Sequence, residues 1–204
     1  TVPIDGLIQH PALVVNKNNP VENPLIAKSD KLYGDRLNSR GLNMNFTSTW
    51  KPFEIAYENE LKREWRAAPV INGETLQEFH DDYDAFAPFD LTHKIGQVRT
   101  ATDQQAKKAL DELAKAWPAW NATAVENRAE VLEKMADLLE HHRVELIALC
   151  TMEAGKTIQD GVDEIREAAD FCRYYALEAR RYGEVKELKG PVGERNIYYH
   201  EGKG

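Results

Sequence analysis

Glu153-Ala154-Gly155-Lys156-Thr157 is the stretch that decides the fold of this chain, because it contains a helix stop followed at once by a helix start. Gly155 can adopt the left-handed conformation that ends a helix. Thr157 has the side chain of a helix N-cap, and Asp160 follows three residues later, as in a capping box. We therefore predict that one helix ends before Gly155 and that another begins after Thr157.

The second of these helices is predicted from about Ile158 to Arg181 and has one apolar face. Its apolar residues recur at alternating steps of four and three: Ile158, Val162, Ile165, Ala169, Cys172, Ala176 and Ala179. The opposite face carries Asp163, Glu167, Asp170 and Tyr174. The pattern predicts a long helix that packs on a core with one face and leaves Glu167 on the other.

The first part of the chain is typical of a connector followed by an aromatic helix. Residues 1–45 are rich in proline and asparagine, so we expect an extended segment with a helical turn or two. A disordered tail is the alternative, but apolar residues such as Leu32 and Tyr33 argue against a free linker. Residues 45–66 predict a helix with a stripe that serves as core or docking surface: Phe46, Trp50, Phe53, Tyr57, Leu61 and Trp65.

Beyond residue 66 the pattern alternates between strands and helices. Three short strands are predicted, at residues 69–73, 85–89 and 95–99. Three further helices are predicted, from an Asp103 cap to about Trp117, from Val125 to about His141, and over residues 144–153. Residues 183–189 and 194–200 are typical of two strands joined by a turn. The expected fold class is α/β, with short strands and long amphipathic helices.

Composition and charge argue against several classes of function. The net charge is −8 at pH 7, whereas phosphate binding needs a basic surface, so nucleic acid is not an expected partner. No apolar run approaches the roughly 18 residues of a transmembrane segment, and there is no signal peptide. Two cysteines without a disulfide framework fit a reducing compartment, so we expect a cytoplasmic protein. Because the chain opens on Thr1, we interpret it as a piece of a longer polypeptide.

The residues suggest no catalytic centre within the chain. Cys150 and Cys172 lie on apolar helix faces, whereas a reactive thiol needs an exposed, electropositive site, so we interpret both as structural. The dinucleotide pattern G-x-G-x-x-G does not occur, and residues 150–157 depart from a P-loop because Cys150 stands at its first glycine. His141 and His142 diverge by about 100° on a helix and cannot chelate one ion. We therefore expect no catalytic, cofactor-binding or metal-binding residue here.

Two groups of segments resemble a known family. The sequence EAGKT at residues 153–157, with EIREAADFCRYYA at residues 164–176, resembles the aldehyde dehydrogenase superfamily in its pyrroline-5-carboxylate dehydrogenase branch. The sequence KLYGDRLNSRGLNM at residues 31–44 resembles the element that links the two halves of bifunctional proline utilization A (PutA) proteins. The resemblance covers most of the chain and is weakest over its first 25 residues or so.

The resemblance implies a domain plan and cofactors. Residues 1–66 would be the inter-domain connector and aromatic helix, residues 67–182 the N-terminal part of an incomplete Rossmann-type coenzyme domain, and residues 183–204 the start of an oligomerisation strand pair. A homo-oligomer would form through the strands at 184–200. The parent protein would oxidise proline with FAD in one half and L-glutamate γ-semialdehyde to glutamate with NAD in the other. This chain would lack the catalytic cysteine and be inactive alone.

Glu167 is the one substrate-lining residue that the resemblance implies. By its position alone it is a solvated glutamate on a polar helix face. In pyrroline-5-carboxylate dehydrogenases, a glutamate nine residues before the alanine that closes the F-x-R-[YF]-x-A stretch faces the aldehyde entry. Counting back from Ala176 gives Glu167. Its carboxylate would contact the amine or imine nitrogen of the substrate.

Two alternatives remain open on the sequence. The first is a stand-alone pyrroline-5-carboxylate dehydrogenase, against which the KLYG…NS…GL element at residues 31–42 argues. The second is a non-catalytic helical module that binds a partner through the aromatic helix at residues 45–66.

Overall fold

The computed structural model describes residues 3–10, 12–13 and 25–202. The chain divides into two compact units, residues 1–38 and residues 39–204, and each is described by itself.

The first unit contains helical turns within irregular backbone. Helix α1 (Ile4–Leu7) is a single turn, and η1 (Ser29–Lys31) is a turn of 3-10 helix. Asn38 closes the segment after η1, because its backbone N–H donates to the Asp30 carbonyl at 2.9 Å and its side chain donates to the Ser29 carbonyl at 3.1 Å. The expected irregular segment with a helical turn or two is thus seen where it is described, and residues 1–2, 11 and 14–24 of it lie outside the described residues.

The aromatic helix is shorter than the sequence predicted. Helix α3 (Thr47–Glu60) ends six residues before the expected boundary, and Trp65 lies in strand β1 (Trp65–Ala67). The helical spacing of Trp65 was overridden by sheet pairing, because β1 pairs in parallel with β5 (Asp90–Arg99). The centre of the stripe is buried as expected, with Phe53 stacked on Tyr57 at a ring-centroid distance of 5.4 Å.

A three-stranded sheet follows, in the order β1-β5-β4. Strand β4 (Asp82–Ala87) pairs antiparallel with β5, and both strands are longer than predicted. Between β1 and β4 lies a small hairpin of β2 (Val70–Ile71) and β3 (Glu74–Thr75). Its turn residues Asn72 and Gly73 both have positive φ, as a tight hairpin turn requires.

Helix α4 (Asp103–Ala122) begins and continues differently from the prediction. Its N-cap is Thr102, not Asp103, because the Thr102 side chain accepts from the backbone of Gln105 and the Gln105 side chain accepts from the backbone of Thr102. The helix also continues through Pro118, where the sequence predicted an end near Trp117. A proline removes one helix hydrogen bond, which weakens a helix without having to end it.

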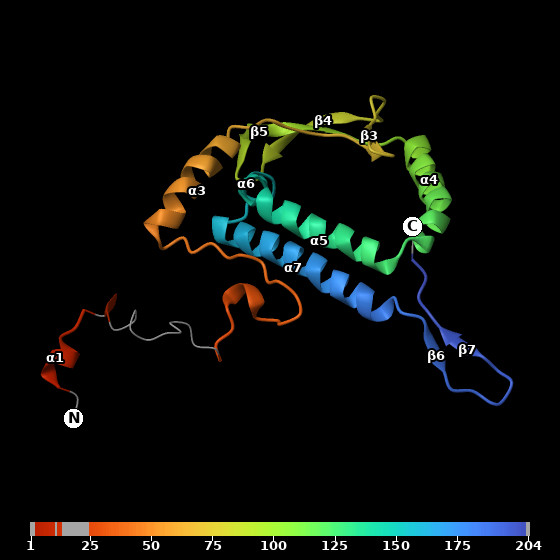
Figure 1. Ribbon diagram of the computed structural model, residues 1–204. Coiled ribbons are helices and arrows are strands. Elements are labelled where there is room, and N and C mark those ends of the chain that lie inside the picture. Colours follow the sequence, from red (N-terminus) through yellow and green to blue (C-terminus); the bar gives the residue numbers. More distant parts are fainter. Residues whose placement is uncertain (1–2, 11, 14–24, 203–204) are drawn as a thin grey trace. The chain divides into compact units, whose positions relative to one another are not determined.

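Three helices follow one another in sequence, and the last two form the main core cluster together with α3 (Figure 1). They are α5 (Val125–His141), α6 (Arg143–Ala154) and α7 (Ile158–Tyr182), close to the predicted boundaries. Figure 1 shows α5 and α7 side by side, and their facing residues are small and fully buried: Ala129, Ala136, Ala169 and Ala176. Small side chains let two helix backbones approach closely, so this pair forms the rigid base of the unit.

The last element is the predicted strand pair. Strands β6 (Lys186–Leu188) and β7 (Asn196–Tyr198) form an antiparallel hairpin, shorter than expected (Figure 1). The mixture of long helices and short strands confirms the predicted fold class.

Candidate functional site

The start of α7 is organised as the sequence predicted. Gly155 has a φ of 65° and ends α6 in the left-handed conformation. The Thr157 hydroxyl accepts from the Asp160 backbone at 3.2 Å, and the Asp160 carboxylate accepts from the Thr157 backbone at 3.2 Å. The hydrogen bonds from Thr157 lower the pKa of Asp160. Since a helix precedes this turn, the segment lacks the strand that a P-loop requires.

An ion-pair ladder joins α5 to α7, and the sequence analysis missed it. Arg180 donates to Glu126 at 2.7 Å and to Glu133 at 2.6 Å. Arg173 donates to Asp137 at 3.0 Å and also to Glu140. A signal was present, because arginines lie seven residues apart on α7 and glutamates seven apart on α5: Arg166, Arg173, Arg180, Glu126, Glu133 and Glu140.

Arg173 is the buried member of this ladder, with only 7% of its surface exposed. Burial alone lowers the pKa of Arg173, but hydrogen bonds to Glu140 and Asp137 more than offset it, so the pKa lies above its ordinary value. Its Nη1 is buried without a hydrogen-bond partner. The guanidinium is therefore held as a cation, with one donor left unsatisfied.

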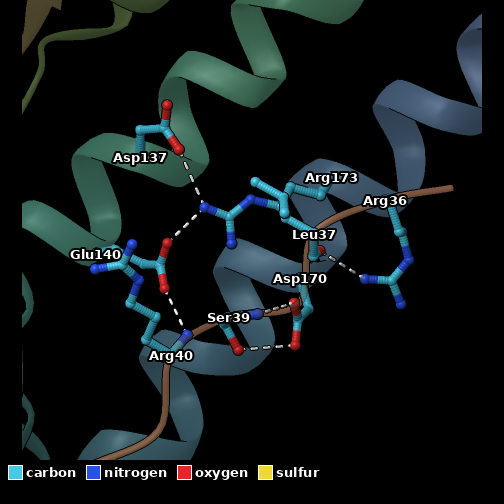
Figure 2. Close-up of polar contacts among 8 residues, drawn as sticks. All are labelled: Arg36, Leu37, Ser39, Arg40, Asp137, Glu140, Asp170 and Arg173. Carbon is cyan, nitrogen blue, oxygen red and sulfur yellow. Dashed lines mark hydrogen bonds and ion pairs between the residues drawn. The ribbon is translucent and has the colours of Figure 1, made fainter. Parts of the chain in front are cut away.

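A short segment, which we call the strap (residues 39–42), lies against these helices. The Ser39 backbone N–H donates to Asp170 at 2.7 Å, and its hydroxyl donates to the other Asp170 oxygen at 2.8 Å. The Arg40 backbone donates to Glu140 at 2.6 Å. Figure 2 shows Ser39 facing Asp170 on α7 and the Arg40 backbone facing Glu140 on α5. Leu42 then packs on the core cluster formed by α3, α6 and α7.

The strap is held by hydrogen bonds to carboxylates, and these outweigh the cost of one buried, unsatisfied nitrogen on Arg166. Each hydrogen bond to a carboxylate stabilises by about 1.5–3 kcal/mol, and the strap makes three. Beneath it, Arg166 Nε is buried with no hydrogen-bond partner, which costs about 1–3 kcal/mol. Ser39 is 3% exposed, so its two bonds are shielded from water. The balance of these contributions stabilises the contact of the strap with α5 and α7.

Glu167 lies where the helical pattern placed it, opposite the apolar face and exposed. Within the part of the chain that the structure describes, its carboxylate has no hydrogen-bond or ion-pair partner. Phe171, one turn further on, is 49% exposed and stacks on Tyr175 at a centroid distance of 6.0 Å. Asp170, which the sequence grouped with Glu167, instead binds the strap.

Neither thiol has the surroundings of a nucleophile. Cys150 and Cys172 are both half-buried on helices, and burial raises the pKa of each. The rings of His141 and His142 meet edge to face, with their centroids 4.9 Å apart. Among the described residues, no group of three potential ligands could hold a metal ion. Within those same residues, no helix is both long and apolar enough to span a bilayer.

The base of the β6–β7 hairpin is tied to the end of α7. The His200 ring lies 3.0 Å from the Tyr182 carbonyl through Nδ1 and 2.9 Å from the Tyr198 hydroxyl through Nε2. Nδ1–H therefore donates to the carbonyl, and Nε2 accepts from the hydroxyl. The rings of Tyr198 and His200 meet edge to face, with their centroids 4.9 Å apart. Near this base lies a groove of about 650 Å³ that the sequence did not predict, lined mainly by Trp120, Val131, Leu132, Tyr174, Tyr175 and Tyr182.

The family is settled by a match over most of this unit. Residues 76–204 match the model of the aldehyde dehydrogenase family. The chain belongs to the aldehyde dehydrogenase family. It is 31% identical over 202 residues to the bifunctional protein PutA of Escherichia coli, covering 94% of this chain and 15% of that protein. It is 33% identical over 135 residues to 1-pyrroline-5-carboxylate dehydrogenase 2 of Bacillus subtilis, covering 66% of this chain and 26% of that protein.

Solved structures agree. A PutA from Bdellovibrio bacteriovorus, inactivated by N-propargylglycine, superposes with a TM-score of 0.76 at 28% identity, covering 87% of this chain and 18% of that one. A 1-pyrroline-5-carboxylate dehydrogenase from Thermus with bound NAD superposes with a TM-score of 0.69 at 25% identity, covering 76% of this chain and 30% of that one. The expected resemblance is confirmed, and the chain spans less than a third of each of these relatives.

Proposed function

We propose that this chain is the connector and front part of the aldehyde dehydrogenase half of a PutA-type bifunctional protein. The whole protein would oxidise proline with FAD and then L-glutamate γ-semialdehyde to glutamate with NAD in the cytoplasm. The chain alone would be inactive, because both of its thiols are held protonated by burial and the catalytic cysteine would lie elsewhere.

The observation that carries this proposal is how far the similarity extends. The similarity to PutA of Escherichia coli covers 94% of the chain, whereas that to the stand-alone 1-pyrroline-5-carboxylate dehydrogenases covers between 65% and 82%. One solved PutA covers 100% of the chain. The strap is the S-x-G-L part of the connector-like element, and its hydrogen bonds to α5 and α7 make residues 39–42 part of the second unit.

The alternative is a stand-alone 1-pyrroline-5-carboxylate dehydrogenase, which several curated relatives are. An antibody to this chain would isolate the native protein for a decisive assay. We expect proline-dependent NADH formation and bound flavin. NADH formation only from added glutamate semialdehyde, with no flavin, would favour the stand-alone enzyme. The purified chain itself should form no NADH from the semialdehyde.

The domain plan follows the same proposal. Residues 1–66 would act as connector and aromatic helix, residues 67–182 as the front of the coenzyme domain, and residues 183–204 as the start of the oligomerisation pair. The hairpin exposes apolar side chains and has open strand edges, which invite pairing with another chain: Val185, Leu188, Val192, Ile197 and Tyr199. Strong hydrogen-exchange protection of residues 197–199 in a strictly monomeric sample would argue against a homo-oligomer through the strands at 184–200.

Glu167 would be the substrate-side residue. Its exposed carboxylate has no partner within the described residues, so it is available to the substrate's nitrogen. In the intact protein, Glu167→Ala should lower kcat/KM for glutamate semialdehyde roughly tenfold, a loss of about 1.4 kcal/mol in transition-state binding. NAD affinity should not change, and a small aldehyde without an amine should be less affected. An unaltered kcat/KM for glutamate semialdehyde would make Glu167 a surface residue only.

A further inference from the structure

Three carboxylates lie along the polar side of α7, and they differ in their hydrogen-bond and ion-pair partners. Asp163 accepts from Gln159 at 3.1 Å and lies 4.0 Å from Arg166. Asp170 accepts two hydrogen bonds from Ser39. Glu167 alone of the three has no partner among the described residues. The polar side of the helix therefore presents one uncommitted carboxylate between two committed ones.

We propose that Ser39 is a positioning residue. By binding Asp170, it leaves Glu167 as the carboxylate that contacts the substrate's nitrogen. The inference rests on the proposed function, because it takes Glu167 as the substrate-side residue. By occupying both oxygens of Asp170, Ser39 prevents that carboxylate from competing for the cationic or imine nitrogen. The strap, which the similarity to PutA includes, thereby becomes a specificity element of the aldehyde dehydrogenase half.

The geometry of the helix places the strap at the border of this face. An α-helix turns about 100° per residue, so Asp170 lies about 60° from Arg173 on one side and about 60° from Glu167 on the other. Arg173 faces α5, and Glu167 is exposed. Asp170 thus marks the edge between the packed and open sides of α7, and the strap grips the helix at that edge.

The strap is also fitted to this position. Ser39 is nearly fully buried, so its hydroxyl is committed to Asp170. A Cβ added to Gly41 would lie 3.9 Å from the guanidinium of Arg166, the residue that precedes Glu167. The strap therefore passes beside Arg166, the residue before Glu167, and binds Asp170, three positions after Glu167.

Hydrogen exchange on the full chain tests the hydrogen bonds between Ser39 and Asp170 independently of catalysis. Asp170→Ala removes both acceptors of Ser39, so the Ser39 amide should exchange about tenfold faster or more. The matched control is Asp163→Ala, which removes an exposed carboxylate from the same helix and should leave the Ser39 amide within about twofold of the wild type. Equal exchange in wild type and Asp170→Ala would overturn the proposal at this step.

Steady-state kinetics on the intact protein tests the positioning role of Ser39. Ser39→Ala removes the hydroxyl bond to one oxygen of Asp170, while the backbone N–H still donates to the other, so KM for glutamate semialdehyde should rise about threefold or more, with kcat and KM for NAD unchanged. Ser39→Thr keeps the hydroxyl and should restore KM. In the Glu167→Ala background, Ser39→Ala should have no further effect, because the residue it serves is gone.

The outcomes separate this inference from the proposed function. If Glu167→Ala alone leaves kcat/KM unaltered, the proposed role of Glu167 fails, and the inference fails with it. If Glu167→Ala impairs the enzyme but Ser39→Ala is silent, or its effect adds fully to that of Glu167→Ala, only the positioning role of Ser39 is refuted.

Discussion

Replacing Arg173 by Met tests whether the buried ion pair holds α5 against α7. Breaking a buried pair by removing one partner costs about 3–5 kcal/mol, because a buried charge is left uncompensated. Here that charge is on Glu140, whose side chain is 19% exposed and would keep only the hydrogen bond from the Arg40 backbone, while Asp137 is 66% exposed and contributes little. Removal of the unsatisfied Nη1 returns about 1–2 kcal/mol. We therefore expect Arg173→Met to lower the free energy of unfolding by about 1–4 kcal/mol.

Urea denaturation of the full chain, followed by circular dichroism, measures this loss as a shift of the midpoint at constant slope. Arg181→Met is the matched control, because Arg181 is 68% exposed on the same helix, and it should change stability by less than about 0.5 kcal/mol. Adding Glu140→Gln to Arg173→Met should cost less than the sum of the single changes, by about 1 kcal/mol or more. A loss below about 1 kcal/mol for Arg173→Met, or strict additivity, would refute the reasoning.

Three further predictions follow from single positions. Burial raises the pKa of Cys150, so its alkylation by iodoacetamide should increase only above about pH 8.5, and the stability from burying the neutral thiol should be present below that pH and lost as pH rises through the folded-state pKa. Gly96→Ala should lower the free energy of unfolding by about 1–3 kcal/mol or more, measured by urea denaturation, because the new Cβ would lie 2.0 Å from the Trp65 carbonyl oxygen. Hydrogen bonds from Arg180 lower the pKa of Glu126, so an NMR titration should place its midpoint below the ordinary value of about 4.3, and the stability from this pair should be lost only as pH falls through that midpoint.

Local sequence signals predicted the existence of the helices and the boundary between α6 and α7 well. The stop at Gly155 and the capping box of Thr157 and Asp160 involve neighbours in sequence, so the residues themselves determine them. The same holds for the apolar face of α7, because its period depends only on helix geometry. The exposure of Glu167 followed from that period.

Local signals failed where distant residues competed. Trp65 continued the helical spacing of residues 45–66, but its pairing with Gly96 drew it into a sheet. The end expected at Trp117 was also wrong, because Pro118 costs a helix one hydrogen bond and the helix tolerates that loss. Asp170 shared the polar face with Glu167 in the sequence, yet the two have different environments in the structure.

The sequence by itself determined the helix pattern, the α/β class and the family, because these depend on residue spacing and on motifs that are contiguous in the chain. Only the tertiary structure decided which polar residues are partnered. Ser39 and Asp170 are 131 residues apart, so no local period reports their contact. The seven-residue spacing of arginines and glutamates indicates two charged faces, but it does not say that Arg173 meets Glu140, 33 residues away. The physical reason is that a carboxylate on a helix surface has the same helical periodicity whether it faces water or a buried donor. Which of the two it faces is decided by the segment that folds back onto it.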